Sequence, residues 1–141
     1  ECFSDLTHLS YANNARGIQN VFNGNYKTVA GKTIGGYGVK NYLVDTNNKE
    51  AADKLAADFA KVEAAFNVIV EKGEKEGIKV DQMIATAGQV SKQGISPEEQ
   101  NVRRSWIENG ITSLQELTAG IENAAKAIGI DNLDADAGSQ F

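Results

Sequence analysis

The chain has 141 residues, 41% of them hydrophobic and 23% charged, which is typical of one folded domain with a sizeable core. Its net charge of −5 argues against binding to nucleic acid or to an anionic membrane surface, because both depend on clusters of lysine and arginine. No apolar run approaches the roughly 20 residues that span a bilayer, so the sequence predicts no membrane insertion.

The start of the chain bears on its location. It begins with Glu1, Cys2 and Phe3 rather than with methionine. Removal of a signal peptide explains such a start and predicts an extracytoplasmic protein, whether secreted, periplasmic or on the cell surface. A domain excised from a longer chain would begin in the same way. Cys2 is the only cysteine, so it is either a plain thiol near a terminus or a site for a disulfide between chains.

A first helix is predicted over residues 5–22, with Ser4 as its N-cap and Asn23-Gly24 as its end. Its approximate apolar face comprises Leu6, Leu9, Ala12, Ala15, Ile18, Val21 and Phe22.

The segment 25–46 is rich in glycine and tyrosine, and its glycine density argues against a helix. The β-forming residues between the glycines predict a small β-hairpin or an ordered loop. A connection of this length is more often functional than incidental. We therefore predict that Tyr26, Tyr37 and Tyr42 are interaction residues; the alternative is that they pack this segment onto the helices.

A second helix is predicted from about residue 48 to residue 73, where Asn47 and Glu50 resemble a capping box. Spacings that alternate between three and four place one apolar stripe on this helix. This 52–69 stripe comprises Ala52, Leu55, Phe59, Val62, Phe66 and Ile69. A shorter third helix follows at about 80–93, and Gly94 is expected to end it.

A fourth helix is predicted from Pro97, with Ser96 as its N-cap. A second stripe with alternating spacing runs along it. This 107–128 stripe comprises Ile107, Ile111, Leu114, Thr118, Ile121, Ala125 and Ile128. The stripe stays in phase on both sides of Gly110, so the helix is expected to continue through Asn109-Gly110.

Together these patterns predict an all-α, antiparallel four-helix bundle of two long and two shorter helices, with the excursion at 25–46 between the first two. Residues 1–141 form a single domain in this interpretation, and 131–141 form a flexible acidic tail.

Chemical groups are sparse. His8 is the only histidine, so metal sites with two histidines are excluded, and His8 is expected on the surface of the first helix. Glu63 and Glu116 are expected on exposed flanks of their helices. The sequence therefore predicts no enzyme, no catalytic residue, no metal and no cofactor.

The leading functional hypothesis is a non-enzymatic, extracytoplasmic binding or assembly module that contacts other protein chains. Self-association into a homo-oligomer or filament is expected, because long apolar stripes are seldom left bare. Arg103, Arg104 and Trp106 are further candidate interaction residues, although Trp106 is more typical of a core position. The alternative is a carrier or sensor that holds a small apolar ligand between its helices, lined by Phe59, Phe66, Ile111 and Leu114.

Overall fold

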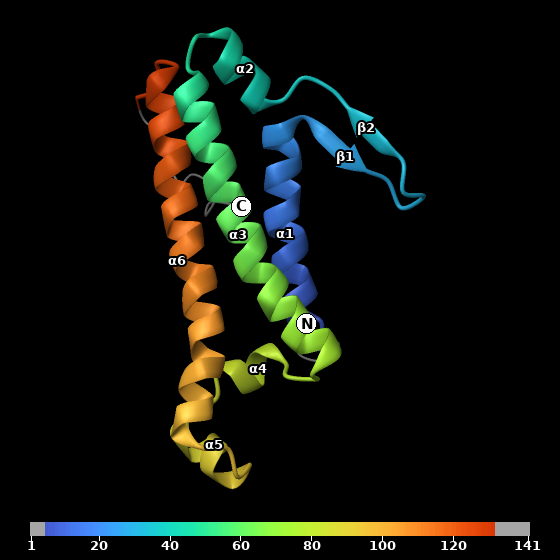
Figure 1. Ribbon diagram of the computed structural model, residues 1–141, viewed down its shortest axis with the longest axis vertical. Helices are drawn as coiled ribbons and strands as arrows, with labels where there is room; N and C mark the ends of the chain where they lie inside the picture. The colour runs from blue at the N-terminus through green and yellow to red at the C-terminus, as the bar shows by residue number, and fades with distance from the viewer. Residues whose placement is uncertain (1–4, 132–141) are drawn as a thin grey trace, which may run out of the picture.

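The computed structural model describes residues 5–131, which are mostly helical, as predicted. Ser4, Cys2 and the tail from residue 132 lie outside the described residues. Three long helices dominate: α1 (Thr7–Asn23), α3 (Lys49–Lys75) and α6 (Pro97–Ala127). Figure 1 shows α3 between the other two, and α3 packs against both. The shorter elements are β1 (Asn25–Lys27), β2 (Thr33–Gly35), α2 (Val39–Asp45), α4 (Val80–Met83) and α5 (Ala87–Lys92).

The 52–69 stripe of α3 forms the centre of the core, as predicted. Each of its six side chains is at most 7% exposed. Phe59 stacks on Phe22 of α1 with ring centroids 4.9 Å apart. The predicted capping box is wrong, because Asn48 is the N-cap of α3 and Asn47 adopts a left-handed conformation with φ of 64°. The helix is therefore placed by the burial of its stripe rather than by a cap.

Helix α6 continues through Gly110, as predicted from the phase of its stripe. Ser96 caps it, and its hydroxyl oxygen accepts a hydrogen bond of 3.1 Å from the N–H of Glu99. The face that α6 buries is nevertheless shifted from the 107–128 stripe. The buried positions include Gly110, Ser113, Leu117, Gly120 and Ala124. Small side chains allow α3 and α6 to approach closely, and this leaves most of the 107–128 stripe half-buried or exposed.

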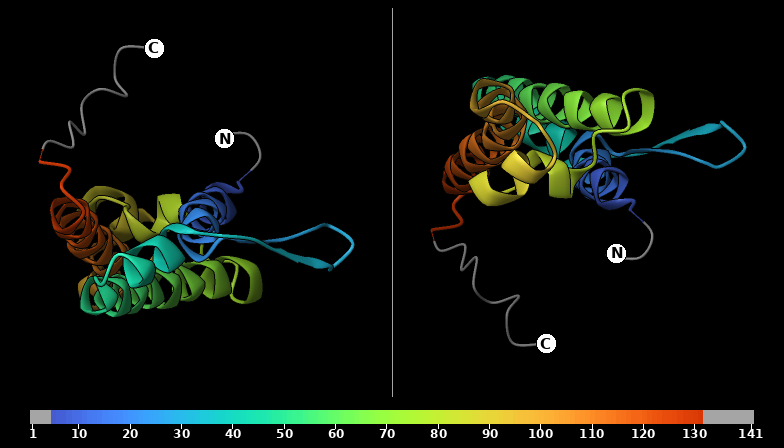
Figure 2. Two further views of the ribbon diagram at one scale, coloured as in Figure 1. Left: turned by 90° about the horizontal axis from the view of Figure 1, so that it is seen from above. Right: turned by 90° about the horizontal axis from the view of Figure 1, so that it is seen from below.

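The excursion contains the small hairpin that the sequence predicted as one of two options. Strands β1 and β2 pair antiparallel, with Tyr26 opposite Ile34. Figures 1 and 2 show the hairpin projecting away from the long helices. The second half of the segment corrects the sequence prediction, because residues 39–45 form helix α2. A hydrogen bond of 3.1 Å from the N–H of Gly38 to the side chain of Asn41 starts α2, and Leu43 is fully buried.

The single helix predicted for residues 80–93 is also wrong, because the structure has two short helices there. The side chain of Gln89 accepts a hydrogen bond of 2.9 Å from the N–H of Thr86 and so starts α5. Gln100 of α6 holds the connection between α4 and α5, since its Nε2 donates to the carbonyls of Met83 at 3.0 Å and Ala85 at 3.2 Å. In the part of the chain that is described, no long fourth helix accompanies α1, α3 and α6.

Candidate functional site

An apolar groove lies between α1 and α6, and its floor is formed by α3. Its volume is about 440 Å³. The lining residues are Tyr11, Asn14, Ala15 and Ile18 of α1, Phe66 and Ile69 of α3, and Ile107, Ile111 and Leu114 of α6. None of these side chains carries a charge. Figure 2, which looks along the long helices, shows α1 and α6 side by side with α3 running along one side of both, and α3 contacts each of them.

Each wall of the groove carries a row of residues with the spacing of a helix-packing surface. On α1, Tyr11, Asn14, Ile18 and Val21 follow at intervals of three, four and three, and the three apolar side chains among them are exposed. On α6, the wall is formed by the first three residues of the 107–128 stripe, Ile107, Ile111 and Leu114, of which Ile111 is 51% exposed. Rows with this spacing normally pack along a partner helix. The groove therefore has the surface properties of an unfilled position in a helical bundle.

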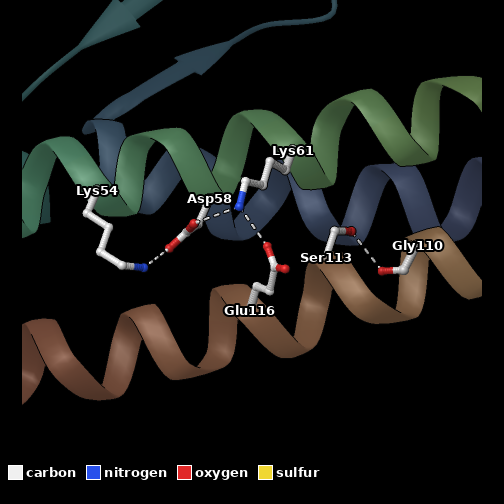
Figure 3. A network of polar contacts seen from close by, with 6 residues as sticks. All are labelled: Lys54, Asp58, Lys61, Gly110, Ser113 and Glu116. Carbon is white, nitrogen blue, oxygen red and sulfur yellow. Dashed lines mark hydrogen bonds and ion pairs between the residues drawn. The ribbon is translucent and has the colours of Figure 1, made fainter.

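A polar network on the opposite flank of α6 joins this helix to α3 (Figure 3). Asp58 is 4% exposed, and its Oδ2 lies 2.8 Å from Lys54 Nζ. Lys61 Nζ lies 2.7 Å from the carboxylate of Glu116 on α6 and 3.7 Å from Asp58. The hydrogen bond to Glu116 raises the pKa of the Lys61 amine. Only Asp58 of this network is buried, and the pair that joins α3 to α6, Lys61 with Glu116, is about half exposed, so it contributes little to holding the α6 wall in place.

His8 is fully buried, which corrects its expected place on the surface of the first helix. Its Nε2 lies 2.5 Å from Glu74 Oε1 near the end of α3. Gly73 makes room for the ring, because a Cβ at that position would lie only 2.7 Å from the His8 ring. The hydrogen bond to His8, with a second one to Lys79, lowers the pKa of the Glu74 carboxyl. This contact ties the start of α1 to the end of α3.

The three tyrosines predicted as interaction residues are all exposed on the excursion. Tyr26 lies on β1 and Tyr42 on α2. The Tyr37 hydroxyl donates a hydrogen bond of 2.5 Å to Asp45, and this bond raises the pKa of the Tyr37 phenol. None of the three lines the groove between α1 and α6. Their role in binding stays a prediction.

The predicted cluster at Arg103, Arg104 and Trp106 belongs to the first part of α6, and Figure 1 shows that this end of α6 lies beside α4 and α5, far from the excursion. Arg103 forms an ion pair of 2.6 Å with Glu99, and Arg104 donates to the carbonyl of Ala85 at 3.2 Å. Trp106 is half-buried beneath the amine of Lys72, which lies 4.9 Å from the ring centroid. The structure therefore does not bring this cluster together with the tyrosines.

The α1 wall of the groove was not predicted as a site. Ile18 belongs to the apolar face expected for the first helix, and Tyr11 lies outside that face. The signal that could have found them is the interval of three, four and three residues from Tyr11 to Val21, which runs beside the buried positions Ala12 and Phe22.

Other chemical sites are sparse in the described part of the chain. Across residues 5–131, no three side chains of histidine, cysteine, aspartate or glutamate come together as metal ligands. Glu63 and Glu116 are exposed, as predicted. None of the described helices is long and apolar enough to cross a membrane.

Comparison with known proteins gives one family. The family model labelled peptidase M75 and described as imelysin matches residues 1–121. No curated protein matches the chain.

Proposed function

The chain belongs to the imelysin family, and from this premise we propose that it is a non-enzymatic, extracytoplasmic binding or assembly module. It acts by contact with other protein chains. The contact surface is the groove between α1 and α6, and the occupant is an amphipathic helix. Cell fractionation with an antibody against the chain tests the proposed location.

The observation that carries this proposal is the incomplete burial of the 107–128 stripe, whose first three residues line the groove. Ile107, Leu114, Ile121 and Ile128 are only half-buried, and Ile111 and Thr118 are exposed. A contiguous apolar surface of this kind is typical of an interaction site. A helix laid in the groove would pack against both walls and complete an antiparallel four-helix bundle.

The absence of enzymatic activity is part of the proposal. The family carries a peptidase label, although imelysin-like proteins are often non-catalytic. His8 is fully buried and hydrogen-bonded to Glu74, so it is poorly placed to meet a substrate. A peptidase assay on a quenched fluorescent peptide library tests this point. Cleavage by the wild type would count against the absence of enzymatic activity, and it would do so even if the cleavage persisted in His8→Ala and Ile111→Glu variants.

The imelysin family is linked to iron uptake. The described residues do not fit a site for iron, because His8 and Glu74 offer two donor atoms that bond to each other and no third ligand joins them. We therefore derive no step that involves a metal in this part of the chain. A contribution to such a process would come through protein contacts.

Binding of a helical peptide tests the proposal. The peptide is a labelled 21-residue amphipathic helix with leucine at the a and d positions of its heptads. We expect its fluorescence anisotropy to rise when the protein is added, and a peptide of the same composition in scrambled order to bind much more weakly. Ile111→Glu should abolish the response. Ile34→Glu is the matched control, because Ile34 is 53% exposed and lies on β2, away from the groove.

A carrier of a small apolar ligand is the second candidate. Phe66, Ile111 and Leu114, three of the four residues expected to line such a cavity, line the groove, whereas Phe59 is buried against Phe22. The groove volume of about 440 Å³ falls within the usual range for ligand pockets, about 300–1,000 Å³. Native mass spectrometry separates the two candidates. A retained small molecule that is lost in Ile111→Glu would favour the carrier.

A further inference from the structure

We propose that a cleft between the end of α1 and the hairpin is a second protein-binding site, and that its occupant is an extended, acidic segment of another protein. This inference goes beyond the proposed function, because the cleft shares no lining residue with the groove between α1 and α6. The hairpin leaves the end of α1 and projects from the helices (Figure 1), and the cleft between them has a volume of about 490 Å³. Gly17 and Val21 of α1 line it together with Tyr26, Ile34 and Gly35 of the hairpin.

Two glycines of the cleft are not required by the fold of the chain itself. Apart from its own neighbours in the chain, a Cβ at Gly17 or at Gly35 would meet no described atom within 4 Å, and neither glycine has a left-handed φ. Gly24 differs, because its φ is 66° and a Cβ there would lie 2.4 Å from the N atom of Gly38. Glycine weakens helices and strands, so a glycine that the fold does not need is typical of a place where a partner approaches the backbone closely. The cleft offers such a place on both of its walls.

Apolar side chains beside these glycines provide the main contact. Val21, Tyr26 and Ile34 are 68%, 54% and 53% exposed. Tyr26 lies directly opposite Ile34 in the hairpin, so both side chains are on the same face of it, and both line the cleft. From Gly17 to Gly24, α1 extends about 10 Å, which is the length of about three residues of an extended chain. An extended segment that places one or two apolar side chains here would cover this surface.

Charge selects an acidic occupant. Residues 6–44 contain four lysine or arginine side chains and no acidic one, so the net charge of −5 for the whole chain leaves −9 for the rest. Within residues 5–131, none of the ion pairs involves Lys27, Lys32 or Lys40. The cleft therefore lies in a positively charged part of an acidic protein, and this part favours a partner of opposite charge.

Lys32 is the cation that an occupant of the cleft would meet first. It lies two residues before Ile34, and its carbonyl accepts a hydrogen bond of 2.9 Å from the N–H of Thr28, which extends the pairing of the hairpin beyond its two strands. Because side chains alternate across a sheet, Lys32 lies on the same face as Ile34. In an extended segment, an acidic residue two positions from the apolar residue lies about 7 Å further along and would face Lys32.

Binding of a labelled peptide tests this inference. The probe has nine residues, with valine, valine, glutamate and glutamate in turn at its even positions and threonine at its odd positions. We expect its fluorescence anisotropy to rise when the protein is added at low salt, and this response to weaken as salt is added. A peptide with lysine in place of both glutamates should bind much more weakly.

Gly17→Leu fills the cleft without disturbing the fold. Its side chain would enter open space, and leucine is favoured over glycine inside a helix, so circular dichroism should show a variant at least as stable as the wild type. It should weaken binding of the acidic peptide by about tenfold or more, because it occupies the centre of the contact. Gly88→Leu is the matched control, since Gly88 is exposed on α5 and also has open space at its Cβ. This control should bind the peptide as the wild type does.

A reversal of charge tests the acidic chemistry separately. Lys32→Glu should weaken binding of the acidic peptide by about fivefold, which is the scale of an exposed ion pair. Lys92→Glu is the matched control, because Lys92 is an exposed lysine on α5.

The inference would be overturned by a wild type that does not bind the acidic peptide, or by a Gly17→Leu variant that binds it equally well. Binding of an acidic polysaccharide or of anionic vesicles in place of the peptide would also overturn it. Self-association that Gly17→Leu abolishes, without binding of the peptide, would overturn the assignment to another protein. Failure here is distinct from failure of the proposed function, because Gly17→Leu should still bind the amphipathic helix, whereas Ile111→Glu should not.

Discussion

Two glycines on the same face of α6 provide a sharp test of how this helix packs on α3. Replacing Gly110 with alanine would place a Cβ 3.5 Å from Ile69 Cδ1, which is an ordinary van der Waals contact. Replacing Gly120 would place a Cβ 2.7 Å from Asp58 Oδ2 and 3.3 Å from Leu55 Cδ1. The first site has room for a methyl group, whereas the second does not. The same substitution should therefore stabilise the protein at Gly110 and bring no gain in stability at Gly120.

The magnitudes follow from helix propensity and packing. Alanine is favoured over glycine inside a helix by about 1 kcal/mol. A buried methyl group adds about 0.8 kcal/mol, so Gly110→Ala should stabilise the protein by about 1–2 kcal/mol. At Gly120 the same propensity gain is offset by overpacking of about 1–3 kcal/mol. Asp58 has little freedom to move away, because it is buried and paired with Lys54. Gly120→Ala should therefore be neutral or cost up to about 2 kcal/mol.

Urea unfolding followed by circular dichroism measures both variants against the wild type. The free energies of unfolding should differ by at least about 1 kcal/mol, with Gly110→Ala the more stable variant. Equal effects, or a loss of stability in Gly110→Ala, would refute the reasoning. Either result would mean that α6 breaks at Gly110 or packs on α3 through a different face.

Three further predictions concern single contacts. Glu74→Gln should flatten the acid side of the profile of stability against pH. The lowered pKa of Glu74 gives a contribution to the free energy of unfolding that is present above the ordinary value of 4.5 and is lost as the pH falls through the lowered pKa. Urea titrations from neutral to acidic pH measure this contribution. Gln100→Leu should cost about 1–3 kcal/mol in the same unfolding assay, because it removes the donor to the carbonyl of Met83, whereas the carbonyl of Ala85 keeps its hydrogen bond from Arg104. In an ultraviolet absorbance titration, the wild type should show one tyrosine that ionises above its ordinary pKa of 10.0, and Tyr37→Phe should remove it. Thermal stability should change little, because the hydrogen bond to Asp45 is exposed. A wild-type titration without such a late component would contradict this prediction.

The sequence predicted α3 well because large apolar residues mark the face that it buries. Helix α6 shows the limit of that signal. Its buried face is built from small residues such as Gly110, Ser113 and Gly120, which a search for apolar periodicity does not recognise. Their contribution is close approach between backbones, and this depends on the surface of α3 opposite them. The 107–128 stripe therefore lies at the edge of the buried face: Ile107, Leu114, Ile121 and Ile128 pack against the core in part, whereas Ile111 stays exposed.

Contacts between distant segments explain the other differences. His8 and Glu74 are separated by 66 positions, and the burial of His8 also needs the absence of a side chain at Gly73. The break between α4 and α5 depends on Gln100 of the following helix, which satisfies carbonyls that a continuous helix would have paired internally. None of these contacts leaves a local pattern. The groove lies where a fourth helix of the predicted bundle would pack, because residues 80–93 form the two short helices α4 and α5 rather than the one shorter helix that was predicted.

Isoleucine methyl NMR tests the central claim, that the groove between α1 and α6 is the binding surface, most directly. A chain of 15.1 kDa gives well-resolved spectra, and each isoleucine reports on its own surroundings. When the amphipathic peptide is added, the δ1 methyl signals of Ile18, Ile107 and Ile111 should shift together, and the signal of Ile34 on β2 should stay in place. Shifts confined to Ile34, with the three groove signals unchanged, would contradict the account.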